Sequence, residues 1–232
     1  MKREILQRME AYMVSCMGDS AHDREHVYRV LGLALTIAET EPAADRDLLT
    51  AACLLHDIGR AEQLADPRLD HALVGAEKAE AWLLGEGFSP AFSAAAAACI
   101  RSHRFRRARP PESIEASILF DADKLDVCGA IGIARTLQYG GRLGCPLYFR
   151  EGGAVADGAE GHSGRGDERN ISFFQEYHFK LEKLYDRFYT AEGARLARER
   201  KAAAENYYEN LLREVRASDA ALAALFPGFG GA

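Results

Sequence analysis

The sequence contains no run that is apolar and long enough to cross a bilayer, and its first residues lack the apolar core of a secretion signal. Its five cysteines are odd in number and include no Cys-x-x-Cys pair, which argues against a disulfide framework or a zinc cluster. The net charge is −6, so the chain as a whole is not predicted to bind nucleic acid or a membrane surface. We therefore expect a soluble cytoplasmic protein with small partners.

The chain also lacks an alternating strand pattern and an internal repeat, whereas apolar residues recur at helical spacing in most segments. The predicted fold class is therefore all-α. A chain of 232 residues that is 48% hydrophobic can bury a full core, and its length fits one helical domain with an appendage or two small domains. We favour a single domain over residues 1–232.

Capping residues and helix breakers mark the ends of the predicted helices. The candidate starts are Asp23, Asp45 or Asp47, Asp70 and Ser89-Pro90, and the candidate stops are Pro42, Gly85, Gly87 and Pro110-Pro111. Residues 140–170 are rich in glycine and carry charges of both signs without a period, so we predict a flexible loop, either a lid or plain disorder. Helical spacing returns over residues 171–217.

One apolar helix leads into Leu54-Leu55-His56-Asp57-Ile58-Gly59-Arg60. His56 continues the core-facing stripe of that helix, so its imidazole is aimed inward. A buried carboxylate beside it needs a compensating positive charge, which a divalent cation can supply. The alternative is a core histidine next to a surface aspartate, and the doublet alone does not decide between the two.

Two other segments place similar side chains beside apolar helix faces. His26 shares a helix side with Val30 and Ile37, and the run Asp121-Ala122-Asp123-Lys124-Leu125-Asp126 sets three carboxylates among apolar neighbours. In chain order the sequence thus presents His26, then His56-Asp57, then Asp123.

This order, with His22-Asp23 shortly before His26, resembles the HD superfamily of metal-dependent phosphohydrolases over about residues 20–140. The run 121–126, followed by Gly129-Ala130-Ile131-Gly132 and later by His178-Phe179 and Lys183-Leu184, is similar to a group of small bacterial HD hydrolases. Some members of that group cleave nucleoside triphosphates to monophosphate and pyrophosphate. The resemblance implies an HD core at 20–140, followed by the glycine-rich loop and the C-terminal helices.

The resemblance implies that His26, His56, Asp57 and Asp123 bind one divalent metal ion. Two nitrogen and two oxygen donors suit manganese, iron, nickel, cobalt or zinc, magnesium is a further candidate, and calcium fits least. Such an ion lowers the pKa of bound water and neutralises charge on a phosphate.

Other site residues are assigned by their positions. In two-metal HD enzymes, histidines in places comparable to His71 and His103 complete a second metal site. The alternative for this chain, left open here, is that both contact phosphate. Lys124 and Arg60 adjoin the ligand motifs and are the candidate phosphate-binding cations.

The general base is left open, and the candidates for proton transfer are Asp126, His71, His103 and Glu62. The basic run Arg101–Arg109 is predicted to be a solvated face rather than a phosphate site.

Two departures from the superfamily narrow the substrate. Arg60 and Ala61 stand where HD enzymes that hydrolyse guanosine tetraphosphate carry a Glu-Asp pair, and the Gly-Tyr-Pro signature of cyclic-di-guanylate phosphodiesterases is missing. The resemblance of the run 121–126 to the pyrophosphohydrolase group implies a nucleoside triphosphate pyrophosphohydrolase, with a small phosphorylated partner. The alternatives are a mixed di-iron oxygenase, which also occurs on this fold, and a catalytically silent nucleotide sensor. The oligomeric state is left open.

Overall fold

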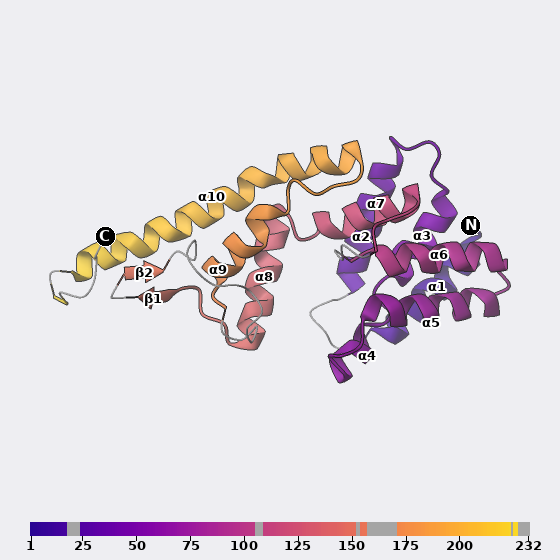
Figure 1. The fold of residues 1–232 in the computed structure, drawn as a ribbon, viewed down its shortest axis with the longest axis horizontal. Coiled ribbons are helices and arrows are strands. Elements are labelled where there is room, and N and C mark those ends of the chain that lie inside the picture. Colours follow the sequence, from indigo (N-terminus) through magenta and orange to yellow (C-terminus); the bar gives the residue numbers. More distant parts are fainter. Residues whose placement is uncertain (18–23, 105–108, 152–153, 157–170, 224, 227–232) are drawn as a thin grey trace. The chain divides into compact units, whose positions relative to one another are not determined.

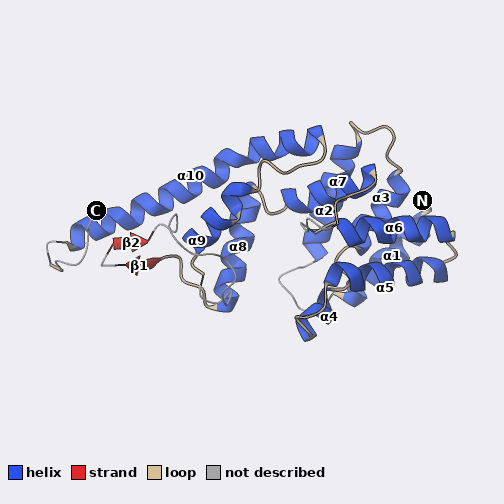
Figure 2. Cartoon of the chain, in the orientation of Figure 1, coloured by secondary structure: helices blue, strands red, loops and turns tan. Residues whose placement is uncertain are grey.

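The computed structural model describes residues 1–17, 24–104, 109–151, 154–156, 171–223 and 225–226. Helices dominate this part of the chain (Figure 2), which confirms the all-α class. The elements are α1 (Arg3–Cys16), α2 (Arg24–Ala38), α3 (Arg46–Leu55), α4 (Arg60–Ala65), α5 (His71–Gly85), α6 (Pro90–Ser102), α7 (Ile114–Leu125), α8 (Gly129–Leu143), β1 (Phe149–Glu151), β2 (Ala154–Ala156), α9 (Phe173–Phe179), a 3₁₀ turn (Leu181–Lys183) and α10 (Ala191–Leu222).

The chain, which Figure 1 traces from end to end, divides into two compact units. The first unit contains Met1–Asp126 and Phe188–Arg195, and the second contains Val127–Arg187 and Leu196–Ala232. His26, the doublet His56-Asp57 and Asp123 all fall in the first unit. A single domain over the whole chain stays a prediction.

The core of the first unit lies between α2, α3, α5, α6 and α7. Helix α5 packs along α6, while α2 packs against both α3 and α7. The largest fully buried side chains there are aliphatic, among them Ile37, Leu49, Leu55, Ile100 and Ile118. Because this core fixes α2, α3 and α7 against one another, it also fixes the helix positions that carry His26, His56 and Asp123.

The predicted helix starts are largely confirmed. Asp45 accepts hydrogen bonds from two amides at the start of α3, Asp70 accepts one at the start of α5, and Ser89 accepts one at the start of α6. Each side chain satisfies an amide that has no partner inside its helix, which is why these residues begin helices. Asp23 lies outside the described residues.

The flexible-loop prediction for 140–170 is wrong for part of that segment. Helix α8 continues to Leu143, and Gly144 ends it with a φ of 75°, a conformation that glycine adopts without strain. Strands β1 and β2 then form an antiparallel pair with Phe149 opposite Ala156. Within the second unit, Arg150 holds this hairpin to α10 through a two-pronged ion pair with Asp219. Residues 157–170 lie outside the described part.

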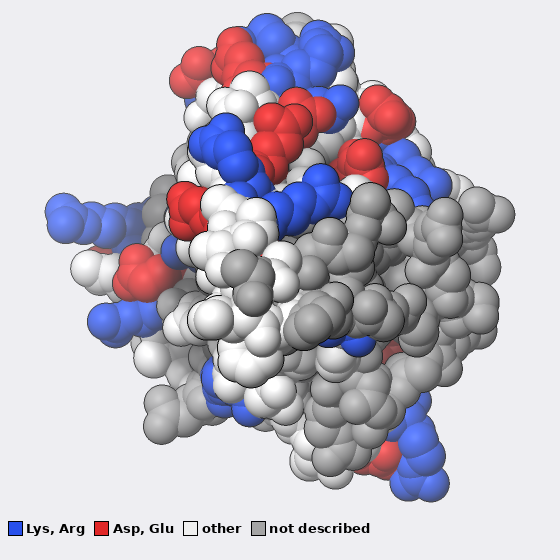
Figure 3. Space-filling model, turned by 90° about the vertical axis from the view of Figure 1, so that its left-hand side faces the viewer, with Lys and Arg blue, Asp and Glu red and all other residues white. Residues whose placement is uncertain are grey.

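The sequence contains basic and acidic residues in similar numbers, 29 Lys and Arg against 35 Asp and Glu. Lys and Arg side chains are interspersed with Asp and Glu on the face shown in Figure 3. Among the described residues, no helix is both long and apolar enough to cross a membrane.

Candidate metal centre

His56 and Asp57 lie in the turn between α3 and α4, and both side chains are buried. Gly59 makes this turn possible, because a Cβ there would lie 2.3 Å from the backbone oxygen of His71. The absence of a side chain at Gly59 therefore lets the doublet lie directly against the first turn of α5.

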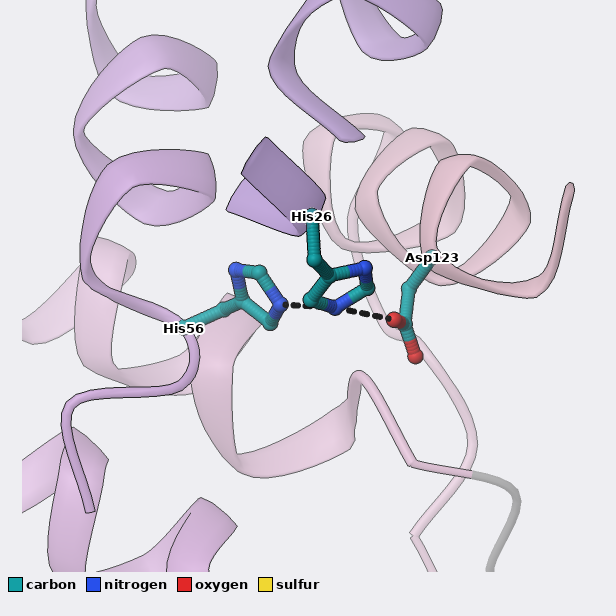
Figure 4. Close-up of side chains that lie close together, drawn as sticks. All are labelled: His26, His56 and Asp123. Atoms are coloured by element: carbon teal, nitrogen blue, oxygen red, sulfur yellow. Dashed lines mark hydrogen bonds and ion pairs between the residues drawn. The ribbon is translucent and has the colours of Figure 1, made fainter. Parts of the chain in front are cut away.

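A first group of candidate ligands consists of His26 from α2, His56 and Asp123 from α7 (Figure 4). The Nε2 atoms of the two histidines are 3.3 Å apart, and Nε2 of His26 lies 3.3 Å from Oδ1 of Asp123. Three helices or helix ends that are distant in the sequence thus direct their donor atoms to one point.

A second group consists of Asp57, His71 at the start of α5 and His103 at the end of α6. Oδ1 of Asp57 lies 3.4 Å from Nε2 of His71 and 3.6 Å from Nε2 of His103. The other carboxylate oxygen, Oδ2, faces the first group at 3.6 Å from His26 and 3.7 Å from His56. Asp57 therefore lies between the two groups and offers one oxygen to each.

The four imidazoles share one orientation, with Nδ1 hydrogen-bonded outward and Nε2 facing the centre. The acceptors are the backbone oxygens of Cys53 for His56 (2.7 Å) and of Ile100 for His103 (2.6 Å), the Gln63 side chain for His71 (2.6 Å) and the Asp126 carboxylate for His26 (2.7 Å). Each acceptor keeps the proton on Nδ1, so the neutral ring presents the lone pair of Nε2 inward, as a metal ligand must.

The surroundings of the histidine rings shift their pKa values in different directions. Burial lowers the pKa of His26, but hydrogen bonds to Asp123 and Asp126 outweigh it and raise that pKa to about 9. Burial dominates at His56 and His71 and lowers their pKa values to about 4 and about 2. His56 and His71 are therefore neutral near pH 7, which is the protonation state that binds metal.

The carboxylates complete a set that fits a divalent cation. Burial opposes ionisation of Asp57, but the His56 ring and Arg60 outweigh it and hold its pKa well below the usual range. The pKa of Asp123 is also low, because its hydrogen bond with His26 outweighs burial. Oδ2 of Asp57 is buried and has no hydrogen-bond partner among the described residues. A buried, ionised oxygen without a hydrogen bond is costly unless a cation lies beside it.

The other predicted site residues have different surroundings. Nε of Arg60 donates to Oδ1 of Asp57 at 2.9 Å. Lys124 is buried, with its Nζ 4.6 Å from the centre of the Phe120 ring and 5.5 Å from that of Phe188. The Lys124 ammonium thus lies against two aromatic rings of its own unit.

The remaining candidates for proton transfer also have partners. Asp126 is buried behind His26 and accepts a second hydrogen bond from Nε of Arg29 at 2.7 Å. Glu62 accepts from Lys78 at 2.6 Å. Arg29 was not identified from the sequence, although its position three residues after His26 puts both on one side of α2. Gln63, which orients His71, was also missed, and no local signal marks it.

The described arginines of the basic run form ion pairs with acidic side chains. Arg101 pairs with Glu80 at 3.1 Å, and Arg104 and Arg109 pair with Asp70 at 3.1 Å and 3.5 Å. Residues 105–108 of the run lie outside the described part.

A comparison with protein families matches residues 24–128 to the HD domain. These residues form an HD domain. The match contains both ligand groups, from His26 to Asp123, and it confirms the resemblance found in the sequence.

Relatives extend the similarity beyond the matched domain. The uncharacterized protein YpgQ of Bacillus subtilis is 29% identical over 221 residues, which cover 92% of this chain and 95% of YpgQ. The structure of YpgQ in complex with ADP aligns with a TM-score of 0.69 at 27% identity, covering 90% of this chain and 97% of that one. A Bacillus thuringiensis protein described as an HD-superfamily hydrolase also aligns with a TM-score of 0.69 at 27% identity, covering 94% of this chain and 100% of that one.

Proposed function

We propose that this protein is a metal-dependent phosphohydrolase that converts nucleoside triphosphates to monophosphate and pyrophosphate. The observation that carries the proposal is the convergence of His26, His56, Asp57 and Asp123 in a buried centre where Oδ2 of Asp57 has no hydrogen-bond partner. These four side chains would hold the metal ion, as the sequence predicts. The ion, when bound, supplies Lewis acidity and lowers the pKa of a water molecule.

The side chains around the ion have separate roles in this proposal. Asp126 is a positioning residue, because the contacts to His26 and Arg29 engage both of its oxygens. Arg60 is the candidate phosphate ligand, since its side chain is 22% exposed and lies directly beside Asp57. Lys124 ranks behind Arg60, because its ammonium lies against aromatic rings.

Support for a nucleotide substrate comes from YpgQ, whose structure was solved in complex with ADP and aligns over nearly the whole chain. Support for cleavage to pyrophosphate comes from the run Asp121–Asp126 and the later His178-Phe179, which resemble the pyrophosphohydrolase group.

The test is incubation with manganese and each nucleoside triphosphate, followed by separation of the products. We expect nucleoside monophosphate and pyrophosphate. Nucleoside diphosphate with orthophosphate, or a preference for monophosphate substrates, would contradict the proposed bond cleavage.

The metal assignment is tested by Asp57→Ala, which we expect to remove both bound metal and activity, because Asp57 contributes to both ligand groups. Asp66→Ala is the matched control, since Asp66 pairs with Arg68 at the surface and contacts none of the ligands described here. Elemental analysis that finds full metal content in Asp57→Ala would refute the assignment.

A di-iron oxygenase is the second candidate, and the observation in its favour is that Asp57 joins two ligand groups with four histidines between them. Iron content and oxygen consumption separate the two enzymes. A nucleotide sensor would bind nucleotide without turnover in single-turnover assays with several metals.

A further inference from the structure

The two oxygens of Asp57 differ in what they already contact. Oδ2 faces His26 and His56 and accepts no hydrogen bond among the described residues, whereas Oδ1 faces His71 and His103 and accepts one from Nε of Arg60 at 2.9 Å. A cation bound to the first group therefore finds an available oxygen. A cation at the second group must share its oxygen with a guanidinium.

The charges of the two groups reinforce this difference. The first group includes the carboxylate of Asp123 in addition to the facing oxygen of Asp57. In the second group Asp57 is the one acidic member, and its charge is already balanced by Arg60. A divalent ion placed beside an ion-paired carboxylate meets the repulsion of the guanidinium, and at short range in a buried site that repulsion is large.

We propose that Arg60 makes metal binding at Asp57, His71 and His103 depend on a bound anion. The inference rests on the proposed function in one respect, which is that the anion is a phosphate group of the substrate. The side chain of Arg60 is 22% exposed, and its guanidinium has the planar fork that matches two phosphate oxygens. A phosphate that engages this fork releases Oδ1 of Asp57 and adds negative charge next to the second group. The chain then holds one metal ion when alone and two when phosphate is present.

The test counts bound manganese ions by equilibrium dialysis, with inorganic phosphate as the probe. Occupancy of both sites by manganese is followed by the electron paramagnetic resonance signal of two spin-coupled ions. For the wild type we expect one tightly bound ion without phosphate, and a dissociation constant of the second ion that falls at least about tenfold when phosphate is added. In Arg60→Met the second ion should bind about as tightly without phosphate as it does in the wild type with phosphate.

Two variants control for other effects. Arg60→Lys keeps the charge beside Asp57 and should retain the phosphate dependence. Arg68→Met removes an arginine that pairs with Asp66 at the surface, and it should leave both ions as in the wild type.

The inference is overturned if the wild type holds two ions without phosphate, if phosphate never brings a second ion, or if Arg60→Met leaves the phosphate dependence unchanged. In each of these cases the first ion and the proposed hydrolysis stand. A wild type that binds no manganese ion at all would instead overturn the proposed function together with this inference.

Discussion

The contact between Asp126 and His26 allows a quantitative prediction. Oδ2 of Asp126 accepts from Nδ1 of His26 at 2.7 Å, and Nε of Arg29 fixes the other oxygen at 2.7 Å. Asp126→Asn keeps the size of the side chain and removes its charge. The carboxylate, by contrast, makes the imidazole a stronger donor to the ion.

The expected loss follows from that change. A hydrogen bond to a charged group contributes about 1.5–3 kcal/mol and one between neutral groups about 0.5–1.5 kcal/mol, so the difference is about 1–1.5 kcal/mol or roughly tenfold. Loss of an outer carboxylate behind a ligand histidine typically weakens metal binding by about 10–100-fold. We therefore expect the dissociation constant to rise by about 10–100-fold.

The assay must separate this loss from proton competition. The pKa of His26 is raised to about 9 without metal, so at pH 7 an incoming ion must displace a proton from the wild type. Asp126→Asn lowers that pKa and reduces the competition. Competition with a chromophoric chelator should therefore show the full loss of metal affinity in Asp126→Asn at pH 9 and a smaller loss at pH 7. Calorimetry in buffers of different ionisation enthalpy should show that, at pH 7, Asp126→Asn releases fewer protons on metal binding than the wild type does.

Asp121→Asn provides the matched control. Asp121 is a buried carboxylate of α7, the helix that Asp126 caps at its C-terminal end. It accepts hydrogen bonds from the backbone of Tyr189 and from Thr190 and not from His26. This control should lose stability and keep the metal affinity. Equal affinity of Asp126→Asn and the wild type at pH 9, with equal proton release, would refute the role of Asp126.

Two further predictions concern stability. The metal-free chain should lose about 2 kcal/mol of unfolding free energy as pH rises from 6.5 to 9. In that range only the folded state keeps the His26 proton, and the rings of His56 and His71, which are neutral in the folded state, offset part of the loss. Urea unfolding that shows constant stability would contradict this. Gly59→Ala should cost about 1–3 kcal/mol, since its Cβ would lie 2.3 Å from the His71 oxygen. Gly85→Ala, where a Cβ meets nothing within 4 Å, should change stability by less than about 1 kcal/mol; equal thermal unfolding of these two variants would contradict the steric argument.

Local features of the sequence were sufficient for the starts of three helices and for the identity of the candidate ligands. Asp45, Asp70 and Ser89 cap the helices they were expected to begin, because a cap acts on amides two or three residues away. The inward direction of His56 follows from its place in an apolar stripe, which is also a local property. Other elements depended on packing, and neither the short helix α4 nor the hairpin of β1 and β2 was anticipated.

The types and order of His26, His56, Asp57 and Asp123 carry the HD pattern, so the sequence was enough to predict that they form one helical centre. The division of that centre into two groups depends on tertiary packing. His26 and Asp126 are 100 residues apart in the chain, and packing of α2 against α7 brings them to 2.7 Å. The packing of the α3–α4 turn against α5 and α6 turns one oxygen of Asp57 toward each ligand group, and it leaves Arg60 beside only one of these oxygens. These relations are set by the angles and separations between helices, to which residues near each side chain in the sequence contribute little.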